Sequence, residues 1–188
     1  ADVYGLDATA TAKVKHVIGD SKNGREIVEK LFAFLQDYTR YVAIEPGVSG
    51  WQPHTSQSVF DNRYGDCKDL TALMISMLKI AGIRGYPAHV KTRSQGLVLS
   101  DFPSNQFNHV IAVVPIENDT IWLECTADLQ PADFVPDSYE GCDVLVVTDH
   151  GGEIWRTPKS KADDNFWSSL VNGSLNNYGD LQFTFSFY

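Results

Sequence analysis

Apolar residues recur at helical spacing between residues 23 and 41 of this 188-residue chain. Asn23, followed three positions later by Glu26, resembles a capping box at the start of a helix. The pattern therefore predicts an amphipathic helix over this segment. The next segment, residues 42 to 62, contains two prolines, two glycines and several hydroxyl residues, which predicts a long loop whose length itself suggests a function.

The clearest helical periodicity follows that loop. From Leu70 to Ala81, apolar residues occupy positions i, i+3, i+4, i+7, i+8 and i+11, and Gly82 supplies a stop. Asp66 is a favourable N-cap residue because its carboxylate can accept from unpaired backbone N–H groups. The pattern predicts a helix over residues 66 to 81 that is buried along one face.

After Gly82 the pattern changes to short runs rich in valine, isoleucine and aromatic residues. Turn signals at Asn118 and Asp119, and again at residues 149 to 152, separate consecutive runs and predict antiparallel hairpins. The predicted strands are residues 86 to 92, 107 to 116, 120 to 125, 142 to 149 and 153 to 158. Helices followed by a meander of strands predict an α+β domain with N-terminal helices packed on an antiparallel β-sheet.

The same pattern divides the chain into three parts. Residues 1 to 22 form an N-terminal lead without a core-forming pattern, and residues 23 to 160 form the main domain. Residues 161 to 188 are expected to form a β-hairpin that opens a following domain. Because the chain has no initiator methionine, we interpret it as a processed chain or a segment of a longer protein with neighbouring domains.

Charge and composition narrow the classes of function. The 24 acidic and 15 basic residues give a net charge of -9, so we expect no nucleic-acid partner. No apolar run approaches the ~20 residues needed to span a bilayer, so we expect no membrane insertion of this segment. The three cysteines, Cys67, Cys125 and Cys142, are too few for a disulfide framework and form no CxxC pair, and we expect no metal or cofactor. The sequence leaves open whether Cys125 and Cys142 form a disulfide.

Candidate chemistry lies in RYGDCKDL, residues 63 to 70. If Asp66 caps the helix, Cys67 is its first residue, where unpaired N–H groups and the helix dipole favour a thiolate over a thiol. The alternative is that Cys67 only fills space as a small apolar side chain, since it lies on the same helix face as the buried apolar residues. The helix start, the preceding glycine and the long preceding loop favour a nucleophile. Lys68 is expected to face solvent.

A cysteine nucleophile needs a base, normally a histidine that is oriented by a third group. His109 is the best candidate because FNHVIAVV is otherwise a strongly apolar strand, where an ionisable group is poorly tolerated without a partner. His16, His54 and His150 are expected to be solvated or locally bonded, and His89, in a predicted strand, to be an ordinary half-buried histidine. Glu124 and Asp128 follow on the hairpin partner of this strand, and either could meet His109 in a suitable register.

These segments resemble the transglutaminase-like superfamily, the circularly permuted relatives of papain-type peptidases, and specifically its bacterial multi-domain members. The resemblance rests on residues 63 to 90, 107 to 114, 121 to 126 and 141 to 147, in that order. It implies a papain-like, transglutaminase-like core and a Cys-His-acid triad carried by Cys67, His109 and Glu124. Relatives usually have Asp, then Pro or Ala, then Thr at the acid, whereas this chain has Glu124 and Cys125 before its threonine.

The resemblance also implies a chemistry. The Cys67 thiolate would attack a carboxamide of a protein or peptide and form a thioester acyl-enzyme, which water (peptidase or amidase) or an amine (transglutaminase) then resolves. The oxyanion donors would be the Cys67 backbone N–H and a group from the preceding loop, for which Gln52 and Trp51 are the candidates, although GWQP could equally be a packed loop anchor. The resemblance to bacterial members of the superfamily also implies a periplasmic or extracellular location.

Two other classes of function remain open. The chain could be a non-catalytic binding or structural domain of a larger bacterial envelope protein that keeps the fold alone. A zinc site built from Cys67, His109 and an acid is the third reading, and it is weak because the ligands lack close spacing and a fourth is not evident.

Overall fold

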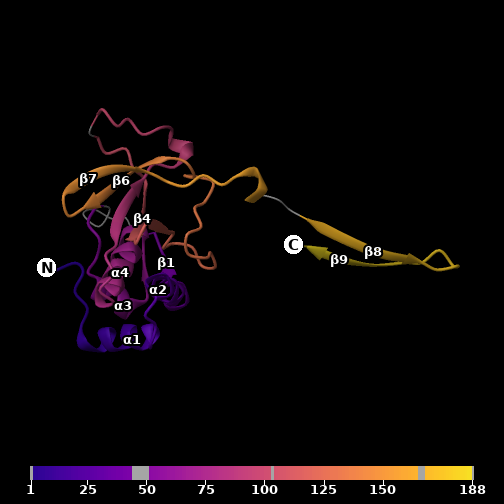
Figure 1. The fold of residues 1–188 in the computed structure, drawn as a ribbon, viewed down its shortest axis with the longest axis horizontal. Coiled ribbons are helices and arrows are strands. Elements are labelled where there is room, and N and C mark those ends of the chain that lie inside the picture. The colour runs from indigo at the N-terminus through magenta and orange to yellow at the C-terminus, as the bar shows by residue number, and fades with distance from the viewer. Residues whose placement is uncertain (1, 44–50, 103, 165–167, 188) are drawn as a thin grey trace. The chain divides into compact units, whose positions relative to one another are not determined.

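The structure, a computed structural model, describes residues 2–43, 51–102, 104–164 and 168–187. The chain divides into two compact units, Ala1–Pro158 and Lys159–Tyr188, and each is described by itself. The first unit contains the helices and the main sheet (Figure 1). The division falls after Pro158, whereas the sequence analysis ends the main domain at residue 160.

Helices make up the first half of the larger unit. They are α1 (Ala8–Ile18), α2 (Gly24–Tyr38), α3 (Ser56–Asn62) and α4 (Cys67–Ile80), and a short 3-10 turn, η2 (Arg93–Gln95), follows later. The predicted helix near residue 23 is confirmed as α2, because the Asn23 side chain accepts the Glu26 backbone N–H at 3.1 Å. The helix predicted over residues 66 to 81 is confirmed as α4, and Gly82, with φ of 72°, ends it in a left-handed conformation.

Two sequence predictions about the helical half are wrong. The N-terminal lead does contribute to the core, because Asp7 caps α1 and the helix buries Ala10 and Val14 completely. Two small buried side chains in eleven residues give too sparse a pattern to identify a buried helix. The expected loop over residues 42 to 62 ends in α3, capped by Thr55. Seven residues are too short to display helical periodicity.

Part of that expected loop, residues 44–50, lies outside the described residues. On either side of it, β1 (Arg40–Tyr41) and β2 (Tyr64–Gly65) pair in parallel. The end of α2 is thereby held beside the residues that precede α4.

The main sheet has five antiparallel strands in the order β5-β4-β3-β6-β7. Their bounds are β3 (Tyr86–Val90), β4 (His109–Ile116), β5 (Asp119–Leu123), β6 (Asp143–Thr148) and β7 (Gly151–Arg156). The two predicted hairpins are confirmed as β4-β5 and β6-β7. The predicted meander is wrong in one respect, because β6 returns to pair with β3, which lies at the centre of the sheet. Local turn signals do not reveal a pairing between strands that are distant in the chain.

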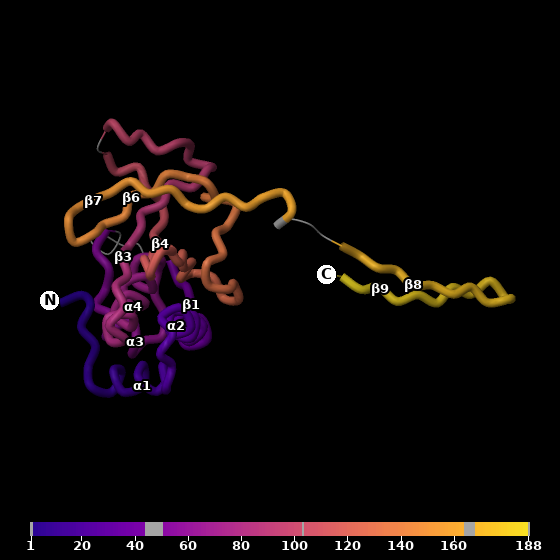
Figure 2. The backbone as a smooth tube through the Cα atoms, viewed as in Figure 1, coloured from indigo at the N-terminus to yellow at the C-terminus, as the bar shows by residue number. Residues whose placement is uncertain are grey.

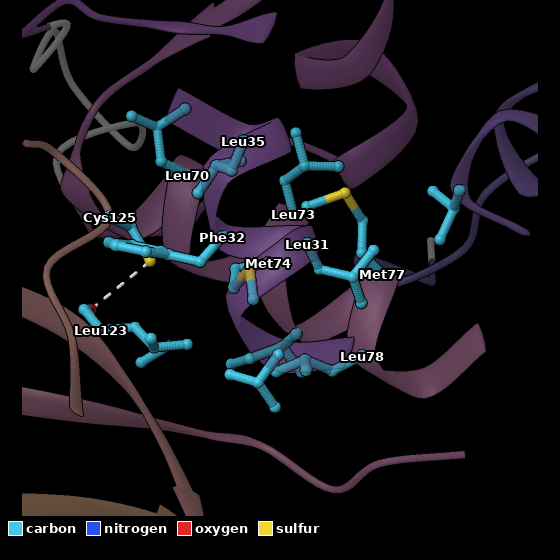
Figure 3. Packing of buried hydrophobic residues seen from close by; sticks show 14 of the residues in the cluster. Leu31, Phe32, Leu35, Leu70, Leu73, Met74, Met77, Leu78, Leu123 and Cys125 are labelled. Atoms are coloured by element: carbon cyan, nitrogen blue, oxygen red, sulfur yellow. Dashed lines mark hydrogen bonds between the residues drawn. The ribbon is translucent and has the colours of Figure 1, made fainter. Parts of the chain in front are cut away.

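Both faces of the sheet are covered. The helices pack on one face, where α2 and α4 contribute Leu31, Phe32, Leu35, Leu73 and Met74 against Leu123 and Cys125 (Figure 3). The opposite face has a smaller cluster that includes Ile111, Val113, Trp122 and Tyr139. Each such buried leucine or methionine contributes about 1.5–3 kcal/mol, so the helix-side cluster anchors α4 firmly against the sheet.

The second unit contains a 3-10 turn, η3 (Ala162–Asp164), and an antiparallel hairpin of β8 (Ser169–Leu175) and β9 (Leu181–Phe187), at the yellow end of the chain in Figure 2. These are the two strands predicted for residues 161 to 188. The register places Val171 opposite Phe185 and Leu175 opposite Leu181, so one face of the hairpin is apolar. Whether the hairpin opens a further domain stays a prediction. Among the described residues, none of the helices is long and apolar enough to cross a bilayer.

Candidate active site

The first turn of α4 is built around two buried carboxylates. Asp66 accepts the backbone N–H groups of Lys68 at 3.1 Å and Asp69 at 3.2 Å, while the Asp69 carboxylate accepts the Asp66 N–H at 3.3 Å. This reciprocal capping box makes Cys67 the first helical residue, as the sequence predicts. The thiol is half-buried there. Lys68 does not face solvent as expected, because its ammonium group pairs with Asp66 and its side chain is only 12% exposed.

Asp69 also holds the segment that precedes α3. His54 donates its backbone N–H to Asp69 Oδ1 at 2.8 Å, and its ring Nδ1 lies 3.0 Å from Asp69 Oδ2. Gly65 is required beside this carboxylate, since a Cβ added there would lie 2.6 Å from the Asp69 Cβ. Trp51 and Gln52 are exposed and lie shortly before His54, so the clamp fixes the chain next to them. Their role as oxyanion donors stays a prediction.

His109 is placed by the start of β4. It pairs with Val90 of β3, and the next residue, Val110, accepts a hydrogen bond through its carbonyl from Thr71 Oγ1 at 3.3 Å. Thr71 lies one turn after Cys67, so this contact brings the first turn of α4 beside His109. The Cys67 side chain is close enough to the His109 ring to raise the pKa of that ring.

The other side of the imidazole faces an acid. His109 Nε2 lies 2.8 Å from Glu124 Oε2, which leaves Nδ1 as the ring nitrogen available to Cys67. The β4-β5 register, with Ala112 opposite Leu123, continues to place Glu124 opposite Ile111, diagonally next to His109 on the same face. Of the two acids that the sequence leaves open as partners of His109, the structure therefore places Glu124 at the ring.

Asp128 lies elsewhere. It is exposed and lines a surface depression of about 830 Å³ together with residues of α2, β1 and the chain after β5. The depression approaches the acid through Thr126, which lines it and also bonds Glu124.

Glu124 is buried and fully engaged. Its Oε1 accepts both the backbone N–H of Thr126 at 3.0 Å and the hydroxyl of Thr126 at 2.5 Å. Its Oε2 accepts the hydroxyl of Tyr139 at 2.5 Å in addition to His109. Tyr139 comes from the long connection between β5 and β6, where no periodicity marks it, and the sequence analysis therefore missed it.

These contacts set the charge states. Burial alone would lower the pKa of His109, but the hydrogen bonds and charges of Cys67 and Glu124 outweigh it and raise that pKa from 6.5 to about 9. Burial alone would raise the pKa of Glu124, but the bond to His109 and its charge, with the Thr126 and Tyr139 hydroxyls, lower it from 4.5 to about 2. At neutral pH the pair is therefore an imidazolium and a carboxylate.

The remaining candidates lie outside this cluster. His16, His54 and His150 are exposed, and burial lowers the pKa of His89 on β3. All three cysteines are free thiols, so the bridge considered between Cys125 and Cys142 is not formed. Cys125 is buried in the helix-side core, where burial and the charge of Glu124 raise its pKa. Over the described part of the chain, no three His, Cys, Asp or Glu side chains are grouped as metal ligands.

A family model of the transglutaminase-like superfamily matches residues 11–127. The chain belongs to this superfamily. The matched range includes Cys67, His109 and Glu124, the three side chains that the structure brings together, and it begins within α1, which agrees with the contribution of that helix to the core. Tyr139 lies beyond the matched range.

Solved structures of other proteins are similar in fold to this one. A "putative protease" from Parabacteroides distasonis ATCC 8503 matches with a TM-score of 0.60 and 13% identity, over 81% of this chain and 28% of the other. A "putative cysteine protease" from Cytophaga hutchinsonii matches with a TM-score of 0.51 and 13% identity, over 66% of this chain and 39% of the other. The chain thus spans well under half the length of either protein, and the likeness concerns the fold. No curated protein matches the chain.

Proposed function

We propose that this transglutaminase-like chain is a cysteine enzyme that cleaves or transfers carboxamide groups of proteins or peptides through a thioester acyl-enzyme. The observation that carries the proposal is His109, whose Nε2 bonds Glu124 and whose pKa is raised by the neighbouring Cys67 thiol as well as by Glu124. A nucleophile, a base and an orienting acid in this order match what acyl transfer requires. The names of the two proteins similar in fold agree with this chemistry.

In the first half-reaction the Cys67 thiolate attacks the carbonyl carbon of the substrate carboxamide. The tetrahedral oxyanion collapses, the C–N bond breaks, and the imidazolium of His109 gives its Nδ1 proton to the leaving amine, which leaves a thioester and a neutral imidazole. A pKa of about 9 for His109 supports this role, because the ring carries the proton throughout the neutral range. The oxyanion would be stabilised by the Cys67 backbone N–H and by Gln52 or Trp51.

In the second half-reaction the neutral His109 takes a proton from water or from an incoming amine, which attacks the thioester and releases the Cys67 sulfur. Water gives a carboxylic acid and an amine gives a new amide. Glu124 keeps Nε2 protonated, so that Nδ1 is the nitrogen that exchanges the proton in both steps.

An activated acyl donor tests the proposal without knowledge of the natural substrate. We expect a p-nitrophenyl ester of a short N-acylated peptide to release a burst of one equivalent of nitrophenol, and an acid quench to leave one acyl group on the protein. Peptide mapping should place that group on Cys67, with the half-buried Cys142 unmodified. Added primary amine should divert product from acid to amide if the chain is a transferase.

A different outcome of the same acylation experiment would contradict the proposal. If no acyl group appears on Cys67, or if it appears equally on Cys142, the thiol is not an activated nucleophile. The alternative, a non-catalytic binding or structural domain of a larger envelope protein, would then be favoured.

A further inference from the structure

The carboxylate of Glu124 receives four hydrogen bonds, two on each oxygen. Thr126 provides both donors on Oε1, and on Oε2 the donors are His109 Nε2 at 2.8 Å and the Tyr139 hydroxyl at 2.5 Å. An ionised carboxylate offers about four acceptor positions, so the group is saturated. Tyr139 and His109 therefore share the negative charge of one oxygen atom.

Tyr139 cannot easily leave this position. Its side chain is buried in the cluster on the sheet face of His109, and the two rings lie 6.0 Å apart between centroids. Its backbone N–H bonds the Pro136 carbonyl at 3.1 Å, and its carbonyl accepts the hydroxyl of Thr157 at 2.7 Å. The hydroxyl is thus presented to Glu124 by a fixed ring on a chain segment tied to the end of β7.

We propose that Tyr139 is a positioning residue of the candidate active site: its hydroxyl fixes the Glu124 carboxylate and limits how firmly that carboxylate holds the His109 imidazolium. Glutamate has one more rotatable bond than the aspartate usual in relatives, and a rigid donor on Oε2 together with Thr126 on Oε1 removes that freedom. The assignment rests on the proposed function for its role in turnover, but its effect on His109 is measurable without activity.

The physical consequence has a definite direction. Two donors on one oxygen compete, so removal of the Tyr139 hydroxyl strengthens the remaining bond from His109. The imidazolium becomes harder to deprotonate and a poorer acid towards the leaving amine. Burial and the charge of Glu124 raise the pKa of Tyr139, so the hydroxyl keeps its proton while His109 titrates. The other titratable groups that act on this pair are Cys67, at the start of α4, and Cys125, directly after Glu124.

The test is a pH titration of the His109 ring nitrogens by NMR in ¹⁵N-histidine-labelled protein, with the signals assigned by their loss in His109→Ala. In Tyr139→Phe we expect the midpoint to rise by roughly half a pH unit or more. If the chain turns over a carboxamide, the alkaline limb of kcat/KM should move upward by the same amount. A side chain that serves only as packing would leave both unchanged. A shift of His109 in a protein without turnover would support the positioning role and contradict the proposed function.

Two controls keep the result specific. Thr126→Val removes a hydroxyl donor from Oε1, the oxygen that His109 does not use, and should shift the midpoint by less than half as much. Tyr86→Phe removes an exposed hydroxyl bonded to Asp149 and should shift nothing. An unchanged or lowered midpoint in Tyr139→Phe, or an equal rise in Thr126→Val, would overturn the proposal.

A second measurement applies even if Tyr139→Phe does not fold. Uniform replacement of the eight tyrosines by 3-fluorotyrosine makes each hydroxyl a stronger donor and changes little in shape. The His109 midpoint should then fall. A midpoint that stays in place, or rises, would also contradict the proposal.

Discussion

Replacing Cys67 by alanine is expected to reduce the rate of carboxamide turnover by about 10⁴-fold or more, while the protein still folds. The size of the loss follows from the chemistry, because no neighbouring group can form the acyl intermediate once the nucleophile is removed. Stability should change little, because alanine is a good helix former and the capping contacts of Asp66 involve backbone N–H groups that the substitution retains. Turnover and thermal unfolding of the purified variant give the two readings.

A matched control uses a second half-buried thiol. Cys142 packs against the cluster on the other side of the sheet, and Cys142→Ala should keep turnover within about twofold. Turnover that survives in Cys67→Ala would show that the reaction belongs to other residues.

The substitution Glu124→Gln is expected to reduce turnover by about 10²- to 10⁴-fold. All neighbours of the carboxylate are donors, and glutamine must place an NH₂ group where one oxygen was. If the NH₂ group faces Thr126, two donors face each other, because the Thr126 backbone N–H is also a donor. If the NH₂ group faces His109, it can donate only to an Nε2 that carries no proton. The second arrangement fixes the wrong tautomer, with the proton on the nitrogen that should receive one from the nucleophile.

Asp128→Asn is the control for this variant. Asp128 is exposed and lines the surface depression, so its amide should leave turnover unchanged within about twofold. Equal losses in the two variants, or full activity in Glu124→Gln, would remove Glu124 from the site.

The Glu124 variant also changes how stability depends on pH. The folded-state pKa of His109 is raised from 6.5 to about 9, so its contribution, about 3 kcal/mol, is fully present below pH 6.5 and is lost as the pH rises to 9. The pKa of Glu124 is lowered from 4.5 to about 2, so its contribution is present above pH 4.5 and is lost as the pH falls to 2. Unfolding by urea at several pH values should show both slopes in the native protein and much weaker ones in Glu124→Gln.

Local signals in the sequence were sufficient for α2, α4 and the two hairpins, because each depends on contacts within a few residues. Asp66 and Asp69 mark the N-terminus of α4 in the sequence, and they thereby identify Cys67 as the first residue of the helix. The parity of strand residues left both Glu124 and Asp128 open as partners of His109. Only the register of β4 against β5 decides between them, and that register is a property of the folded hairpin.

Contacts between distant segments could not be predicted in the same way. Tyr139 reaches Glu124 from an irregular connection, and His54 reaches Asp69 from a segment whose residues carry no periodic pattern. The burial of α1 depends on its contacts with α2 and α4, which come later in the chain. The pairing of β6 with β3 depends on a return of the chain that no turn residue encodes.

The central claim is that Cys67 and His109 form a reactive pair, and the rate of Cys67 alkylation at pH 6 tests it most directly. A free cysteine, with a pKa of about 8.5, has roughly one thiolate in 300 molecules at that pH and reacts slowly. Iodoacetamide followed by peptide mapping should label Cys67 well ahead of Cys125 and Cys142, and His109→Ala should slow that labelling by about tenfold or more, because the imidazolium that stabilises the thiolate is gone. If native Cys67 does not label at pH 6, or labels equally fast without His109, the pair does not exist and the binding-domain alternative becomes the better account.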